Sequence, residues 1–167
     1  GTTASLQKYI KLGELVISTC GVRVDGECRV VVMPEYPAVG NYEVVMALIQ
    51  AAEELNERYH VGITASADTF YAGQARPTPE GYLPSHKENI LRDLQAANVV
   101  NFEMEVSCLF TLANVFKKRA GAICAVIAHR VTDEFEINDE VQKRAGAVAS
   151  LAVTILAKWD KEKEKKG

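Results

Sequence analysis

The sequence predicts an α/β fold, a three-layer α/β/α domain with a mixed, mostly parallel central sheet. Two patterns lead to this prediction. Short apolar, β-branched segments alternate along the chain with longer segments of helical periodicity. The short segments are apolar at consecutive rather than alternate positions, which is typical of strands that helices cover on both faces.

The N-terminal segments predict a loop followed by two strands. Gly-Thr-Thr at residues 1–3 is expected to be a loop. Residues 15–24 are mostly apolar or β-branched and form the first predicted strand. The turn signal Asp25-Gly26 follows, so residues 29–33 are expected to return as the second strand of a hairpin.

A helix, a strand and a long loop are predicted next. Asn41 is the candidate N-cap of a helix over residues 42–58, where apolar residues recur on one face. Residues 59–66 form a strand rich in β-branched residues. The prolines and glycines between residues 67 and 84 predict a loop rather than a regular element.

The second half of the chain continues the alternation and ends in a charged segment. The predicted elements are a helix from Ser85 to Ala97, a strand over 99–104, a helix over 105–118, a strand over 120–131 and a helix from Asn138 or Asp139 to Trp159. We assign residues 1–160 to a single α/β domain. Residues 161–167 mix lysine and glutamate and are expected to be a charged tail.

Composition excludes several classes of function. The 167 residues suffice for one core, and a net charge of −3 gives no basic surface for nucleic acid. The longest wholly apolar run, residues 122–128, is too short to span a bilayer, and no signal-peptide pattern opens the chain. We therefore expect a cytoplasmic protein without nucleic-acid or membrane partners.

Cysteine and histidine give no pattern of metal ligands. No two of the four cysteines form a C-x-x-C pair, and the three histidines are scattered. Reduced thiols and no metal site are therefore expected.

Segments with polar residues follow three of the predicted strands. These segments are the loop after Ser66, Glu103-Met104-Glu105, and His129-Arg130. In α/β sheets, ligands bind at the carboxyl ends of strands, so these segments are the candidate site. A buried Arg130 needs an anion or a carbonyl as partner, or an ion pair with one of the acidic residues just after it.

The Glu-Met-Glu segment places two carboxylates at the edge of a core. Such groups cost desolvation free energy unless a polar group pairs with them. An ionised carboxylate only accepts hydrogen bonds, which suits the two vicinal hydroxyls of a ribose. Alternatively, Glu105 stabilises the first turn of a helix and Met104 is a core residue.

Residues 68–76 combine two aromatic rings, an amide and a guanidinium. An aromatic face packs against a planar ring. Gln74 offers a donor and an acceptor, and Arg76 offers a fork of donors. Together they fit a planar edge that alternates carbonyl and N–H groups, as uracil does. The alternative is a surface loop in which these residues have no joint role.

These segments together resemble the nucleoside phosphorylases, and within them the uridine phosphorylases. The similar segments keep the family's order and are residues 1–3, 15–26, 61–74 and 101–105. Two departures are notable. His129 stands where the uridine enzymes usually have Asn, and the family's N-terminal portion, which supplies phosphate-binding Gly and Arg residues, has no counterpart here. We therefore expect this chain to be part of a longer polypeptide, the C-terminal two-thirds of such a domain.

The resemblance implies a role for each candidate residue. Thr2 would contact phosphate and ribose, Phe70 would pack against the nucleoside, and Arg130 would lie near the base. The implied catalytic residues are Arg76, Gln74 and Glu105. The implied substrate-binding residues are Thr2, Thr3, Phe70, Gln74, Arg76, Glu103, Met104, Glu105 and Arg130.

The resemblance further implies phosphorolysis of a pyrimidine nucleoside, in which uridine and phosphate give uracil and ribose 1-phosphate. Gln74-x-Arg76 favours a pyrimidine, as does Arg130, which stands near the place of an Asp that protonates the base in purine members. Phosphate is a co-substrate, no cofactor is implied, and a homo-oligomer is expected (a dimer or a hexamer of dimers). The alternatives are a purine nucleoside phosphorylase, a nucleosidase of the same fold, or a non-catalytic nucleoside-binding paralogue.

Overall fold

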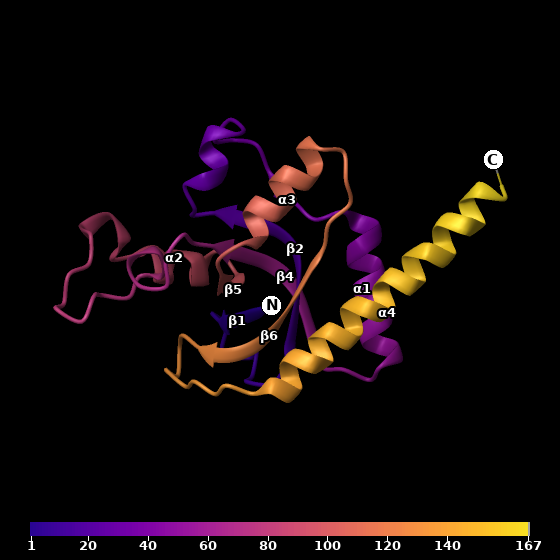
Figure 1. Ribbon diagram of the computed structural model, residues 1–167. Coiled ribbons are helices and arrows are strands. Elements are labelled where there is room, and N and C mark those ends of the chain that lie inside the picture. The colour runs from indigo at the N-terminus through magenta and orange to yellow at the C-terminus, as the bar shows by residue number, and fades with distance from the viewer. Residues whose placement is uncertain (167) are drawn as a thin grey trace.

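The computed structural model describes residues 1–166 and shows an α/β fold with six strands and four α-helices (Figure 1). The strands are β1 (Thr2–Ser5), β2 (Leu15–Arg23), β3 (Ala38–Val39), β4 (Tyr59–Ser66), β5 (Val99–Glu103) and β6 (Ala122–His129). The helices are α1 (Tyr42–Glu54), α2 (Ile90–Ala96), α3 (Val106–Val115) and α4 (Asp139–Glu164), with short 3-10 helices η1 (Glu27–Val30), η2 (Ala72–Gln74) and η3 (Ser85–Lys87).

Five of the strands close into a small barrel. Hydrogen-bonded neighbours run β3-β2-β4-β5-β1-β6, and β2 also pairs with β6, so that Leu15 lies opposite Ala125 and Ser18 opposite Ala122. The mixed α/β class is confirmed. The three-layer arrangement is not confirmed, and three of the six strand pairings among the described residues are antiparallel. Consecutive apolar residues are typical of any doubly covered strand, so they cannot distinguish an open sheet from a closed one.

The four helices pack on the strands of this barrel. The main core lies where α1 and α4 pack together against β2 and β6, while α3 packs on β2 and α2 lies beside β5 (Figure 1). Representative buried side chains of the main core are Ile17, Leu48, Ile123, Val148 and Ile155. No helix among the described residues is both long and apolar enough to cross a bilayer.

The N-terminal segment is a strand, so the loop predicted for residues 1–3 is wrong. β1 lies between β5 and β6, antiparallel to one and parallel to the other, with Ala4 opposite Phe102. These pairings hydrogen-bond the backbone of β1 on both sides, which gives a four-residue segment strand structure that its own sequence does not favour.

The predicted hairpin is also wrong, because η1 stands where its second strand was expected. The carboxylate of the buried Asp25 accepts the N–H of Cys28, and the carboxylate of Asp68 accepts the N–H of Gly26. Side chains therefore satisfy backbone groups that a strand partner would otherwise bind.

Two helix caps occur as predicted. The side-chain oxygen of Asn41 accepts the N–H groups of Glu43 and Val44 at the start of α1, and Asn138 caps α4 in the same way. The predicted cap at Ser85 is wrong: it lies in η3, and α2 begins only at Ile90. Helix starts are thus predictable where one asparagine precedes one periodic segment.

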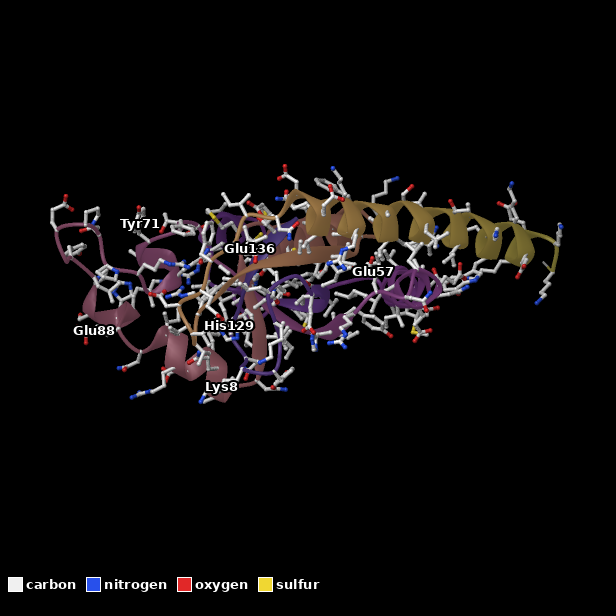
Figure 2. The ribbon with its side chains drawn as sticks, turned by 90° about the horizontal axis from the view of Figure 1, so that it is seen from below. Lys8, Glu57, Tyr71, Glu88, His129 and Glu136 are labelled. Atoms are coloured by element: carbon white, nitrogen blue, oxygen red, sulfur yellow. The ribbon has the colours of Figure 1, made fainter. Side chains whose placement is uncertain are left out.

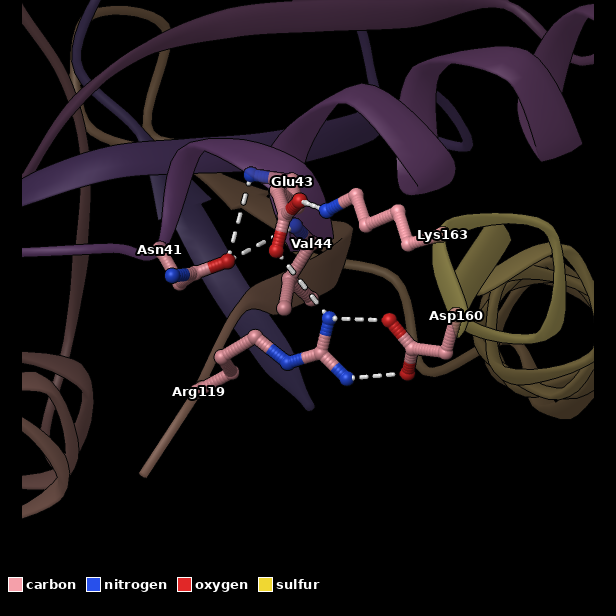
Figure 3. A network of polar contacts seen from close by, with 6 residues as sticks. All are labelled: Asn41, Glu43, Val44, Arg119, Asp160 and Lys163. Atoms are coloured by element: carbon pink, nitrogen blue, oxygen red, sulfur yellow. Dashed lines mark hydrogen bonds and ion pairs between the residues drawn. The ribbon is translucent and has the colours of Figure 1, made fainter. Parts of the chain in front are cut away.

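A network of charged side chains fastens the end of α4 to α1 (Figure 3). The guanidinium of Arg119 contacts Glu43, at 3.1 Å between Nη1 and Oε2, and Asp160. The ammonium of Lys163 contacts the other oxygen of Glu43. α4 continues to Glu164, so part of the segment expected as a tail from residue 161 is helical and is held by this network.

Candidate active site

A cavity of about 140 Å³ lies at the ends of β1, β5 and β6. Eight of the nine predicted site residues line it, although they come from separate segments of the chain. The eight are Thr2, Thr3, Phe70, Gln74, Arg76, Glu103, Met104 and Glu105. Ala4, Phe102, Ile127, Ala128 and Phe135 complete the lining. The fold thus brings the predicted residues together, while their roles stay predictions.

Glu103 uses its carboxylate to hold the start of α3. One oxygen accepts the hydroxyl of Ser66, and the other accepts the N–H groups of Glu105 and Val106, each at 2.7 Å. The residue is buried, and its desolvation raises the pKa of the Glu103 carboxyl, although these hydrogen bonds act in the opposite direction. Both oxygens of Glu103 therefore accept hydrogen bonds from the protein itself.

Further contacts hold the start of α3 against the barrel. Ser107 donates its N–H to Ser66 Oγ at 2.8 Å and its hydroxyl to Asp25. α3 also approaches β2 closely, because a Cβ atom at Gly21 would lie 2.8 Å from Cα of Ser107. Glycine at this position is thus required for the close packing that fixes the segment following Glu103.

Glu105 and Met104 face the cavity from this fixed segment. Glu105 is exposed and occupies the N-cap position of α3, yet its side chain makes no capping hydrogen bond. Glu103 accepts the helix N–H groups instead. The alternative role for Glu105 as a helix-start carboxylate is therefore not supported by its contacts, and its oxygens are available to a ligand.

Gln74 and Arg76 form a paired set of donors and acceptors on another wall of the cavity. Arg76 Nη1 donates to Gln74 Oε1 at 2.7 Å, and its guanidinium carbon lies 4.1 Å from the centroid of the Phe70 ring. Ala75, between them, adopts a left-handed conformation with φ of 55°. The buried Gln74 keeps its amide NH₂ group as a donor for a ligand.

Arg130 lies outside the cavity lining, behind Gln74. Its Nη1 donates to the backbone oxygen of Gln74 at 2.7 Å, so of the alternatives weighed for this residue the carbonyl partner is the one observed. Burial, and then the charge of Arg76, lower the pKa of Arg130 to about 10, which leaves it protonated at neutral pH. Arg130 therefore supports the backbone of Gln74, and its implied place near the base stays a prediction.

A buried chain of hydrogen bonds holds β1 in place. Asn101 Nδ2 donates to Thr3 Oγ1 at 2.7 Å, and Thr3 Oγ1 donates to the carbonyl of Phe102 at 2.6 Å. Asn101 Oδ1 in turn accepts from Thr64, which bonds to Ser18. The hydroxyl of Thr3 is thus engaged in the core, whereas its exposed neighbour Thr2 lines the cavity.

Sequence reasoning missed several of these residues. Ser18, Thr64 and Asn101 are polar positions within apolar strands, and that interruption was the available signal. Phe135 lines the cavity from the loop after β6, where it is the one aromatic among acidic residues. A functional role for it could have been inferred from this contrast.

Comparisons with known proteins show the family of this chain. Residues 1–158 match the family model of the phosphorylase superfamily. A uridine phosphorylase of Thermococcus kodakarensis is 53% identical over 100% of this chain and 60% of its own length. A uridine phosphorylase of Escherichia coli is 36% identical over 95% of this chain and 62% of its own. A guanosine phosphorylase of Halorubrum lacusprofundi is 30% identical over 93% of this chain and 60% of its own. The chain thus spans about three-fifths of the length of these relatives, and it belongs to the phosphorylase superfamily.

Proposed function

We propose that the protein containing this chain is a uridine phosphorylase, which converts uridine and inorganic phosphate to uracil and ribose 1-phosphate. One observation carries the proposal: a single cavity joins the free carboxylate of Glu105 with the donors of Gln74 and Arg76, and its walls include the apolar Phe70 and Met104. This combination matches a ribose attached to a planar base with polar edges. Relatives of that name support it.

The base end of the cavity would stabilise the leaving group. Cleavage of the glycosidic bond leaves negative charge on the oxygens of uracil, and Arg76 and the amide NH₂ of Gln74 are the donors that face it. The second lone pair of Gln74 Oε1 can accept the ring N–H, because Arg76 uses only the first. These bonds strengthen as charge develops, so they favour the transition state over bound uridine.

The ribose end would position the sugar for attack. Glu105 accepts the two ribose hydroxyls, and Met104 packs beside the sugar. Thr2, which lines the cavity and a wider adjoining hollow of about 530 Å³, is placed to contact both ribose and phosphate. Phosphate itself is the nucleophile, so the proposed reaction needs no protein nucleophile and no cofactor.

The assembly and location of the protein are part of the same proposal. The resemblance to the uridine phosphorylases supports a cytoplasmic homo-oligomer built on a dimer, either a dimer or a hexamer of dimers.

The full-length protein is expected to turn over uridine faster than inosine when phosphate is present. A site built to pair a polar pyrimidine edge leaves its own donors unsatisfied when another base binds. Parallel assays of the two nucleosides, each with and without phosphate, decide the point. Inosine cleaved about tenfold faster would assign the protein to purines. Equal rates without phosphate would make it a nucleosidase, and no turnover of either would favour a binding protein.

Glu105→Gln is expected to lower kcat/KM for uridine about tenfold, because hydrogen bonds to a charged acceptor are about twice as strong as neutral ones. The loss for 2′-deoxyuridine should be smaller, since one of the two hydroxyls is already missing. Glu140→Gln is a matched control, because Glu140 is exposed at the start of α4. Equal losses on both nucleosides would contradict the assignment of Glu105 to the ribose hydroxyls.

A further inference from the structure

His129, the last residue of β6, is buried and accepts two backbone hydrogen bonds. Its Nδ1 accepts the N–H of Val131 at 3.1 Å and the N–H of Thr132 at 3.3 Å. A ring nitrogen that accepts a hydrogen bond carries no proton, so this geometry requires the neutral imidazole with its proton on Nε2. The side chain thereby closes the turn that follows β6.

This turn places Arg130, which lies within it. The Arg130 N–H donates to the carbonyl of Ser5 at 2.8 Å, and its guanidinium holds the carbonyl of Gln74. A chain of contacts therefore runs from His129 through Arg130 to Gln74, which lines the cavity. Figure 2 shows His129 near Glu136, in the half of the molecule away from the C-terminal end of α4.

We propose that His129 is a positioning residue for the base end of the site, and that it acts through the acceptor lone pair of Nδ1. The proposal rests on the proposed function, since its kinetic consequence concerns uridine. Without this acceptor, the N–H groups of Val131 and Thr132 would be left unpaired. The turn would then open, and Arg130 and Gln74 would lose their fixed positions.

Two amide substitutions test whether the turn requires a hydrogen-bond acceptor at the place of Nδ1. In His129→Asn the side-chain oxygen takes the place of Nδ1 and can accept both N–H groups at any pH. In His129→Gln the amide lies one bond further out, near the place of Nε2, so the two N–H groups lose their acceptor. Both variants retain a polar side chain.

KM for uridine, measured with the full-length protein, tests the proposal. Wild type and His129→Asn should agree. KM of His129→Gln should rise about tenfold relative to both, with a smaller change in kcat. If His129→Asn behaves like His129→Gln, or His129→Gln behaves like wild type, the proposal is wrong.

A measurement without substrate keeps this test independent of the proposed function. Nitrogen-15 spectra of the imidazole should show an unprotonated Nδ1 at about pH 8, and hydrogen exchange at Val131 and Thr132 should be slow in wild type and His129→Asn but fast in His129→Gln. A proton on Nδ1, or equal exchange in all three proteins, would overturn the proposal. A wild type with this signature but no uridine turnover would overturn the proposed function alone.

Discussion

Arg76→Ala is expected to lower kcat for uridine phosphorolysis by about 10²–10³-fold, which corresponds to about 3–4 kcal/mol of lost transition-state stabilisation. In the proposed reaction the guanidinium faces the place where negative charge develops on the departing base, and it also donates to the amide oxygen of Gln74. Steady-state rates at saturating uridine and phosphate measure the effect. KM should change less than kcat, because bound uridine carries none of that charge.

Two variants make this prediction specific. Arg76→Lys keeps the charge but not the fork of donors, so its rate should fall between those of wild type and Arg76→Ala. Arg92→Ala removes an exposed arginine on α2 that pairs with its neighbour Asp93, and its rate should equal that of wild type. A rise in KM with unchanged kcat for Arg76→Ala would place Arg76 in ground-state binding instead.

Glu103→Leu is expected to lower the free energy of unfolding by about 3 kcal/mol or more. The substitution leaves the N–H groups of Glu105 and Val106 and the hydroxyl of Ser66 without their acceptor, and each buried unsatisfied donor costs about 1–3 kcal/mol. Urea denaturation followed by circular dichroism measures the change, provided that the slope with urea stays constant.

Glu103→Gln is the matched control. Its amide oxygen can accept both N–H groups while its NH₂ donates to Ser66 Oγ, so it should cost less than Glu103→Leu. Because burial raises the pKa of Glu103 above its unfolded value, protonation contributes stability that is present below the unfolded pKa and is lost as pH rises through the folded pKa. Glu103→Gln should lack this contribution. Equal stability of the leucine variant and wild type would show that Glu103 does not anchor α3.

The sequence by itself determined the family, because the family depends on residue types in a fixed order. It also predicted eight residues that the structure brings to one cavity. Short motifs at strand ends keep their chemistry wherever the chain places them, and Asn41 and Asn138 cap the helices next to them through local hydrogen bonds. Local patterns of this kind need no knowledge of distant partners.

Only the tertiary structure decided how the two neighbouring carboxylates divide their roles. Glu103 accepts donors from Ser66 and from the start of α3, whereas Glu105, two positions later, remains free to face the cavity. Arg130 turned out to support Gln74, and β2 met β6 to close the barrel. These outcomes depend on which groups from distant segments lie within hydrogen-bonding distance, and desolvation then makes each such pairing obligatory. The sequence specifies which polar groups are present, but it does not specify the distances between them in the folded chain.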